Sequence, residues 1–382
     1  MDAGADCRVA CVSPFRVVPP HTGGRAVIEG ACRAWARRVP GFVCAALTTW
    51  RDARTPAPAP EFEYVELPSA WSLLISLERF GLTKVPYLWS YRYRVPKLAC
   101  WLRDREPDVV EMNLPWLYAL KDHLPSSTRV VLCMQNVEAI WYEDLLGGSR
   151  LFLERLRRIE AAAVARADHI LTLTEQDRRE IHRRYGRALD AITVSPPGMD
   201  AMPEGAVHGR GAEDRVRAVF VGSAFSDNVR AARYLIRELA PRCAGFADFI
   251  LVGDVCGAVR DEVAPANVLR TGRVDDLRGL LKTCDVFVNP NAMRTGINIK
   301  VMDAWAAGLR VITTPEGARG YENLAGIAMD VVPLDKMDSW IRKGRRLRAG
   351  EVEHLRPYLW DEIIRKRLAL YRRLREPCEC SG

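Results

Sequence analysis

Short apolar runs alternate with helix-like segments along most of the chain, and this rhythm predicts the fold class. In the first half, apolar runs occupy residues 7–13, 42–50, 108–113, 128–135, 168–174 and 191–195. In the second half, they occupy residues 217–222, 248–253, 267–272, 285–290 and 310–315. Strands that are apolar on both faces and separated by helices are typical of parallel sheets covered on both sides. Two such series predict two doubly wound α/β domains.

The segments between these runs carry helical periodicity. We expect helices at residues 23–38, 228–240, 275–283, 297–307 and 358–374. Proline and glycine are concentrated at residues 195–215, which predicts the seam between the two domains there. The helix at 358–374 belongs to neither series.

Composition is that of a globular protein long enough for two domains. The chain has 382 residues, of which 48% are hydrophobic and 27% are charged. Its net charge is +8, and the segment Ile341–Glu376 holds twelve Arg and Lys against five Asp and Glu. No nucleic-acid-binding motif accompanies this charge, so we expect no nucleic-acid partner. We interpret the basic segment as a solvated helix face, with contact to anionic lipid as the alternative.

The pattern of the eleven cysteines and the absence of targeting patterns together predict the cellular compartment of the protein. No pair of cysteines has zinc-ligand spacing, and Cys11, Cys44, Cys133 and Cys284 lie in apolar runs as small hydrophobes. The terminal Cys378 and Cys380 could oxidise or bind metal, although a frayed terminus is favoured. The N-terminus lacks a signal-peptide pattern, and no run approaches the ~18 apolar residues of a membrane span. We therefore expect a cytoplasmic protein, with peripheral contact to the inner face of the cytoplasmic membrane as the alternative.

The stretch of residues 294–320 carries the strongest candidate chemistry. Gly296 and Asn298 lie where a loop turns into a helix, so free backbone N–H groups there can point at a phosphate. Lys300 adds a positive charge, and Asp303 follows on roughly the same helix face. A carboxylate beside a phosphate site is suited to accepting hydrogen bonds from ligand hydroxyls, such as those of ribose. The alternative is a surface ion pair between Lys300 and Asp303.

Two other helix starts are weaker signals. Gly23 and Gly24 open the first predicted helix and would let a ligand approach the backbone, but a tight turn explains them equally well. They belong to neither a dinucleotide-binding fingerprint nor a P-loop. Ser226, Asp227 or Asn228 can cap the helix that follows the strand at 217–222.

Several segments resemble, in order and spacing, the retaining glycosyltransferases of family four. These segments are PPHTGG (19–24), QNVEAIWYE (135–143), VSPPGMD (194–200), VLRTGRVDDLRGLLKTCDVFVNP (268–290) and GINIKVMDAWAAGLRVITTPEGARGY (296–321). The resemblance implies the GT-B fold, with two Rossmann-like domains facing a cleft. It implies an N-terminal domain at residues 1–197, a nucleotide-sugar domain at 198–355, and a C-terminal helix at about 356–376 that crosses back onto the first domain.

The same resemblance implies a function and a set of site residues. A sugar would move from a UDP- or GDP-linked donor to a saccharide, lipid-linked or small-molecule acceptor, with retained configuration and without metal or cofactor. Asp303 would take the ribose hydroxyls, the backbone N–H groups from Gly296 to Ile299 the diphosphate, and Arg273 and Val274 the base. The full donor-binding set is Gly23, Gly24, Gly222, Ser223, Asn228, Arg273, Val274, Arg294, Gly296, Ile297, Asn298, Ile299 and Asp303, and the catalytic set is Lys300, Gln135 and Thr295.

The sequence departs from the family pattern at several of these positions. Thr295 stands where a Glu is usual, Gln135 where a His is frequent, and Ser223 and Asn228 where Arg and Lys are frequent. The available cations are Lys300, Arg294, Arg230 and Arg25. A non-catalytic relative that binds a nucleotide-sugar or a partner is therefore a second hypothesis. A two-domain epimerase is disfavoured, because only His21 of the six histidines lies in an obvious cleft loop.

Residues 68–105 are unusually aromatic and basic. Trp71, Phe80, Tyr87, Trp89, Tyr91 and Tyr93 lie where acceptor-binding loops could lie. The alternative is that these side chains form the core between two helices.

Overall fold

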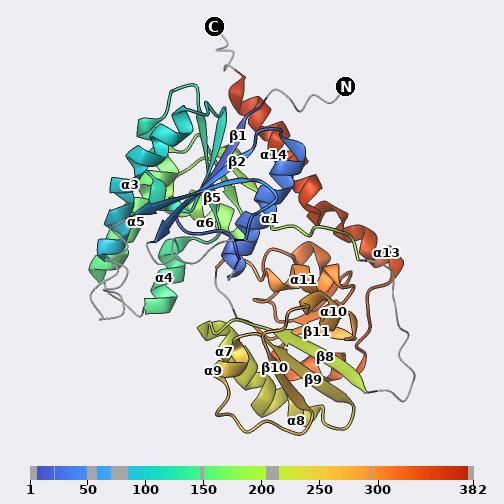
Figure 1. The fold of residues 1–382 in the computed structure, drawn as a ribbon. Coiled ribbons are helices and arrows are strands. Elements are labelled where there is room, and N and C mark those ends of the chain that lie inside the picture. The colour runs from blue at the N-terminus through green and yellow to red at the C-terminus, as the bar shows by residue number, and fades with distance from the viewer. Residues whose placement is uncertain are drawn as a thin grey trace. The chain divides into compact units, whose positions relative to one another are not determined.

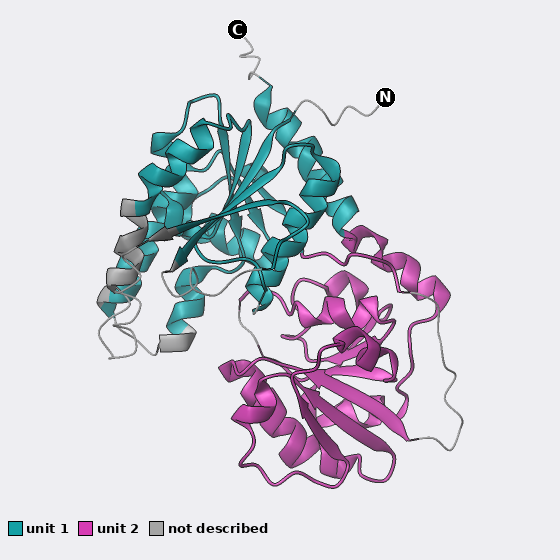
Figure 2. Ribbon diagram, in the orientation of Figure 1, with its two compact units in different colours: residues 1–196, 360–382 teal, residues 197–359 magenta. Residues whose placement is uncertain are grey.

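The computed structural model describes residues 7–20, 22–49, 58–69, 85–146, 150–203, 215–292 and 295–376. The chain divides into two compact units (Figure 2). Unit 1 contains Met1–Pro196 and Trp360–Gly382, and unit 2 contains Pro197–Leu359. Each unit is built around its own sheet (Figure 1).

The sheet of unit 1 is parallel throughout. Its seven strands lie in the order β3-β2-β1-β4-β5-β6-β7. Their bounds are β1 Val9–Ser13, β2 Val43–Thr49, β3 Glu63–Ser69, β4 Val109–Asn113, β5 Arg129–Met134, β6 His169–Thr172 and β7 Ile192–Val194. The strand order reverses between β1 and β4, so the connections on the two sides of this point run in opposite directions.

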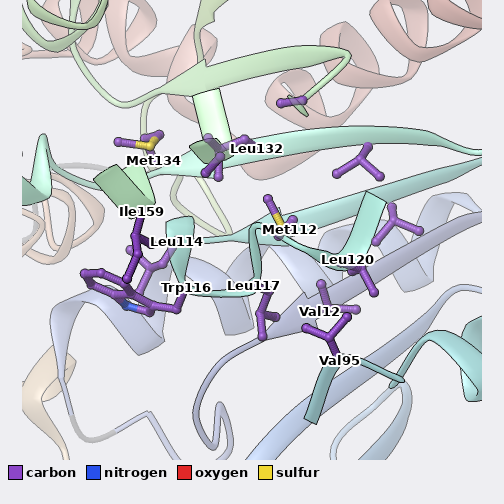
Figure 3. Packing of buried hydrophobic residues seen from close by; sticks show 14 of the residues in the cluster. Val12, Val95, Met112, Leu114, Trp116, Leu117, Leu120, Leu132, Met134 and Ile159 are labelled. Atoms are coloured by element: carbon purple, nitrogen blue, oxygen red, sulfur yellow. The ribbon is translucent and has the colours of Figure 1, made fainter. Parts of the chain in front are cut away.

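Helices cover this sheet and bury its apolar side chains. They are α1 Gly23–Arg38, α3 Val85–Arg103, α4 Glu138–Leu146, α5 Arg150–Arg166, α6 Glu175–Tyr185 and α14 Trp360–Arg375. Figure 3 shows part of the core: Val12, Met112 and Leu132 project from adjacent strands toward Val95 of α3 and Ile159 of α5. All five are at least 92% buried, as expected for strands that are apolar on both faces.

Unit 2 repeats the arrangement with six parallel strands in the order β10-β9-β8-β11-β12-β13. The strands are β8 Val216–Val221, β9 Ala247–Val252, β10 Val268–Gly272, β11 Val286–Asn289, β12 Arg310–Thr313 and β13 Met329–Val331. The first helix, α7 Ser226–Tyr234, continues through a π-helical turn at Leu235–Leu239 into α8 Ala240–Arg242. The other helices are α9 Val255–Ala258, α10 Leu277–Lys282, α11 Lys300–Ala306, α12 Met337–Arg342 and α13 Ala349–Val352.

The sequence predicted all but two of these strands. The strands β3 and β13 escaped detection, and both lie at an edge of their sheet. β3 carries Glu63 and Glu66, because an edge strand need not be apolar on both faces. β13 has only three residues and is joined to β12 by an ion pair between Arg310 and Asp330, with 2.7 Å between Nη2 and Oδ1. The helix expected at 297–307 begins three residues later, at Lys300.

The aromatic segment at 68–105 is described only in part. Its residues 85–103 form α3, which contains Pro96. Trp71 and Phe80 lie outside the described residues, as do the side chains of Tyr87, Trp89, Tyr91 and Tyr93. Both interpretations of these aromatics remain sequence-based predictions.

The C-terminal helix α14 belongs to unit 1 and lies against α1 (Figure 1). A Cβ atom on Gly30 would lie 2.5 Å from Nε1 of Trp360, so only glycine allows this approach. Trp35 of α1 stacks on Tyr371 of α14, with ring centroids 5.5 Å apart. Through these contacts, the last helix of the chain packs against its first helix.

A buried ion pair fastens α14 to the sheet. Nη1 of Arg367 lies 3.1 Å from Oε1 of Glu111 on β4, and both side chains are at least 94% buried. Nε of Arg367 donates to Oγ of Ser195 at 2.8 Å, and the hydroxyl of Tyr371 donates to Glu111. Each charged group is both paired and hydrogen-bonded. Removing one partner would therefore leave the other as a buried charge without an opposite charge beside it.

We expect Arg367→Met to lower the free energy of unfolding by about 3 to 5 kcal/mol, because Glu111 would keep its charge without a partner. Urea unfolding followed by tryptophan fluorescence measures the effect. Arg365→Met is the matched control: Arg365 lies on the same helix in an exposed pair with Glu362, and its loss should cost less than about 1 kcal/mol. Equal midpoints for the two variants would contradict this account.

Candidate functional site

The candidate site of unit 2 lies where the strand order reverses. β8 and β11 are neighbours at this point, and each is followed by a loop at its carboxyl end. In open α/β sheets, ligands bind in the crevice that such diverging loops leave. The loop after β8 holds Gly222 and Ser223, and the loop after β11 leads through Gly296 to Lys300.

Close backbone packing shapes the loop after β8. A Cβ atom on Gly253 would lie 2.4 Å from the carbonyl oxygen of Gly222, and Gly253 has a φ of +99°. Only glycine satisfies both conditions. Gly222 in turn lies under Asn228, because a Cβ atom there would be 3.1 Å from Cβ of Asn228. The first turn of α7 is therefore held close to the strand end.

Asn228 has a different role from the one that its position suggested. The prediction that Ser226, Asp227 or Asn228 caps α7 is wrong: the helix begins at Ser226, and the capping position is Phe225, which makes no side-chain cap. Nδ2 of Asn228 donates to Oγ of Ser223 at 3.1 Å, and its Oδ1 accepts from Nζ of Lys300 at 2.8 Å. Asn228 thus connects the loop after β8 to the start of α11.

Lys300 is held by neutral groups. Its Nζ donates to the Asn228 amide oxygen and lies 4.3 Å from the centroid of the Phe220 ring. Among the described residues, no ion pair joins Lys300 to Asp303, so the surface-pair alternative does not apply. Burial lowers the pKa of the Lys300 ammonium to about 7, and the nearby charge of Asp227 only partly opposes this shift. The ammonium is short of compensating negative charge, which an anionic ligand would supply.

The loop before α11 offers unused backbone donors. Within the described part of the chain, the backbone N–H groups from Gly296 to Ile299 make no hydrogen bond. Gly296 has a φ of +75°, which allows the chain to turn there at little cost. A run of unpaired N–H groups beside a cation is suited to an anion such as a phosphate.

Residues that are distant in the sequence hold this loop through hydrogen bonds. Asn298 is buried, and its Oδ1 accepts from Nδ2 of Asn291 at 2.9 Å while its Nδ2 donates to the carbonyl of Gly317 at 3.2 Å. Nε of Arg319 donates to the carbonyl of Gly296 at 3.2 Å, and the Tyr321 hydroxyl donates to the carbonyl of Asn298 at 3.3 Å. The carbonyl groups of Gly296 and Asn298 thus accept hydrogen bonds from protein, whereas the N–H groups of Gly296–Ile299 have no partner among the described residues.

Asn291 extends the same network and was missed by the sequence reasoning. Its Nδ2 also contacts Oδ1 of Asn228 at 3.3 Å, so Asn228 accepts from both Asn291 and Lys300. Asn291 is 99% buried two residues after the end of β11. A polar residue just past a buried strand at the switch point was the available signal.

Asp303 lies one turn after Lys300 on α11 and is accessible to solvent. It makes no ion pair or hydrogen bond within the described residues. Desolvation by the surrounding protein raises the pKa of its carboxyl to about 6. The carboxylate is therefore available to a ligand, and its charge depends on pH just below neutrality.

The remaining predicted residues of unit 2 are less closely gathered. Thr295 is buried, with 3% of its surface exposed. Arg273 is exposed and paired with Asp254, with 2.6 Å between Nε and Oδ1, and Val274 is half-buried beside it. Arg230 pairs with Asp227, and Arg294 lies outside the described residues. Among the described residues, Lys300 is the proposed cation that directly follows the loop of N–H groups, at the start of α11.

In unit 1, the structure brings Gly24 and Gln135 together. Gln135 follows β5, and its Nε2 donates to the carbonyl of Gly24 at 2.9 Å. A Cβ atom on Gly24 would lie 2.3 Å from Oε1 of Gln135, so the amide occupies the space that a side chain would need. Thr22 caps α1 through the backbone N–H of Arg25, and Gly23 is exposed in the first turn. The guanidinium of Arg25 lies over the ring of Phe15.

A buried carboxylate supports the Gln135 segment. Oε1 of Glu160 accepts from the backbone N–H of Glu138 at 2.7 Å, and its Oε2 accepts from that of Ala139 and from the Tyr185 hydroxyl. Burial, together with the charge of Glu160, raises the pKa of the Glu138 carboxyl to about 8. Glu160 lies within a helical pattern 25 residues away from Gln135, and no feature of the sequence indicates this contact.

Two family models match the chain. The one described as Glycosyltransferase Family 4 matches residues 23–202, and the one described as Glycosyl transferases group 1 matches residues 215–347. Together they match most of the chain. A search of curated proteins found no match.

Solved structures share the fold along nearly the whole chain. Sucrose-phosphate synthase from Thermosynechococcus elongatus is 15% identical with a TM-score of 0.70, and the match covers 96% of this chain and 99% of that one. A lipopolysaccharide outer core galactosyltransferase is 11% identical with a TM-score of 0.63, and coverage is again 96% and 99%. An Anabaena protein, HepE, in complex with UDP and glucose is 10% identical with a TM-score of 0.61, covering 95% and 100%. At these identities the likeness shows the fold, which is GT-B.

The Lys300 amine should become reactive near neutral pH, because burial lowers its pKa to about 7. Labelling with a trace of acylating reagent between pH 6 and 10, read by peptide mass spectrometry, should show half-maximal reactivity near pH 7. A lysine in a model peptide, with a pKa of about 10.4, is the reference. Reactivity that follows the reference peptide would contradict the described environment of Lys300.

Proposed function

The chain belongs to the family 4 glycosyltransferases, and from this premise we propose that it moves a sugar from a nucleotide-sugar donor to an acceptor with retention of anomeric configuration. The observation that carries the proposal is the Lys300 ammonium beside the free N–H groups of Gly296–Ile299. A nucleoside diphosphate is the leaving group of such a transfer, and it departs with negative charge. Fixed N–H dipoles and a cation stabilise that charge without needing to reorganise.

We assign the diphosphate to the N–H groups of Gly296–Ile299 and to the Lys300 ammonium. We also assign to this site Ser223, in the loop after β8, and Asn228, in the first turn of α7. Asp303 accepts hydrogen bonds from the ribose hydroxyls, and Arg273 and Val274 border the base. Arg273 directly precedes Val274, and its guanidinium donates two hydrogen bonds to the Asp254 carboxylate.

Lys300 is suited to binding a diphosphate tightly only in its charged form. Because burial lowers the pKa of its ammonium to about 7, the charge of Lys300 in the free protein depends on pH around neutrality. A bound diphosphate favours the ammonium and raises this pKa. Binding above pH 7 therefore takes up a proton.

The proposed chemical step needs no side-chain base. The bond between the anomeric carbon and the leaving phosphate oxygen breaks, and the acceptor oxygen bonds to that carbon on the same face. The acceptor proton passes to the leaving phosphate oxygen, so charge and atoms balance within the two substrates. We propose a metal-independent reaction, in which protein groups provide the stabilisation that a metal would supply elsewhere. Gly23, Gly24 and Gln135 of unit 1 are assigned to the diphosphate or acceptor side.

The donor and acceptor are proposed by class. We propose a UDP- or GDP-linked hexose, a choice that accords with the UDP and glucose bound in the HepE complex. Candidate acceptors are a saccharide, a lipid-linked glycan or a small natural product. None of the described helices is long and apolar enough to cross a membrane. We propose a cytoplasmic location, with peripheral membrane contact as its alternative because Arg372, Arg373 and Arg375 end α14.

A second candidate is a relative that binds the nucleotide-sugar without turnover. Thr295, which is buried at the position of the usual Glu, favours it, since a threonine cannot provide the charge of a carboxylate. Gln135 favours it too, because an amide cannot titrate near neutrality as histidine does. Both candidates share the donor site and differ in turnover.

Asp303→Ala should lose the preference for a ribose. We expect wild-type protein to bind a nucleoside diphosphate about tenfold or more tightly than its 2′,3′-dideoxy form, because hydrogen bonds to a charged group contribute about 1.5 to 3 kcal/mol. The variant should bind both forms with similar affinity. Isothermal titration calorimetry measures the affinity of each protein for each of the two ligands. A ribose preference that survives in Asp303→Ala would remove Asp303 from the ribose site.

Lys300→Met should weaken nucleoside diphosphate binding about 10- to 100-fold, because it removes a charge-assisted contact. Lys300→Arg keeps the charge and is the matched control. Wild-type affinity should fall as pH rises from 7 to 9, whereas that of Lys300→Arg should stay nearly constant. Donor hydrolysis, read as release of the nucleoside diphosphate, separates the two candidates: binding without turnover of any donor would support the non-catalytic relative.

A further inference from the structure

Three cysteine thiols meet in the core of unit 1. Cys11 lies on β1, Cys32 on α1 and Cys44 on β2, and their Sγ atoms all lie within 4.8 Å of one another. Cys11 and Cys44 are directly paired in the register of the two parallel strands. Cys32 lies on the buried face of the covering helix. Each side chain is at least 99% buried.

The surroundings of this three-cysteine cluster differ from those of the other buried thiols. Nδ2 of Asn113 donates to Sγ of Cys11 at 3.1 Å. By contrast, Cys133 and Cys256 place their Sγ against backbone carbonyls. An N–H donor aimed at sulfur favours the thiolate, whereas a carbonyl acceptor favours the thiol.

From this geometry we propose that Cys11, Cys32 and Cys44 form a trigonal site for a soft monovalent metal ion, Cu(I). Thiolate sulfur is the ligand type that selects Cu(I). A structural zinc ion is disfavoured, because it takes four ligands and the group found among the described residues has three. The site is separate from the proposed sugar transfer and takes no part in that step.

Neighbouring groups oppose the charge that the site would gain. Binding displaces thiol protons, so the complex is anionic and the affinity rises with pH. Cys11 and Asn113 line a small cavity together with Glu111 and Arg367. The Asn113 amide donates to the sulfur directly, and the Arg367 guanidinium balances the Glu111 carboxylate. Through its hydrogen bond, Asn113 would act as the outer partner that orients the Cys11 ligand.

Binding would connect three consecutive elements of the chain. The site joins β1, α1 and β2, and α1 begins at the Gly23–Gly24 turn. An ion that binds the folded chain and not the unfolded chain raises its melting temperature by mass action. Metal binding therefore has a readout that is independent of any transferase activity.

The test uses the full chain with Cys100, Cys378 and Cys380 replaced by serine, since Cys100 is exposed and the other two lie beyond the described residues. Cu(I) is supplied without oxygen as its bicinchoninate complex, both to the folded protein and during refolding, because burial will slow access of the ion to the thiols. We expect one Cu(I) per chain, a first shell of three sulfurs by X-ray absorption, and a higher melting temperature.

Single cysteine variants test whether the three cysteines are the metal ligands. Cys44→Ser and Cys32→Ser change one sulfur to a nearly isosteric hydroxyl, and each should lose the bound ion, whereas the control Cys284→Ser should keep it. Absence of Cu(I) after refolding, or retention of the ion in both cluster variants, would overturn the proposal. A disulfide within the cluster in protein purified without oxygen would also overturn it, since the site would then be a redox pair.

Discussion

Both units are organised by one constraint, which is that a parallel sheet covered on both faces leaves its strand ends as the place where a large ligand can bind. The backbone groups along each strand are paired with neighbouring strands, and apolar side chains fill both faces. Polar groups that can meet a ligand as large as a nucleotide therefore lie in the loops at the carboxyl ends or in the first turns of the helices that follow. In unit 2 the order of strands reverses between β8 and β11, so the loops after these strands diverge. Gly222, Asn228, Asn291 and Lys300 all lie in or beside those two loops.

Electrostatics connects this architecture to the proposed donor site. Two cations in this protein, the buried Arg367 and the half-buried Lys300, lie in opposite electrostatic surroundings. Arg367 is paired with Glu111 and hydrogen-bonded to Ser195, so its charge holds α14 to the sheet. Lys300 faces an amide oxygen and an aromatic ring, and burial lowers the pKa of its ammonium to about 7. The first arrangement stabilises the fold, and the second is completed by an anion.

The elements with strong local patterns could be predicted from the sequence, whereas the contacts of the site could not. Apolar runs located the central strands, but the edge strands β3 and β13 lacked the two-sided apolar pattern. Lys300 and Asp303 were recognised as a pair one turn apart, yet they do not contact each other. Asn228, one of three candidate caps of α7, does not cap the helix and instead accepts a hydrogen bond from Lys300. Residue spacing did not indicate that Glu160 supports the Gln135 segment. It also did not indicate that Cys11, Cys32 and Cys44 lie together.

The sequence by itself determined the alternation of buried strands and helices, the two-unit organisation it implies, and the glycine-rich loop that leads into Lys300. Those features depend on local properties: the period of apolar residues, backbone freedom at glycine, and the charge of a single side chain. Only the tertiary structure decided which groups meet. Asn228 and Lys300 are 72 residues apart, and Gly24 and Gln135 are 111 apart. Their contacts follow from the order of the strands in each sheet, which the local pattern of the sequence does not encode.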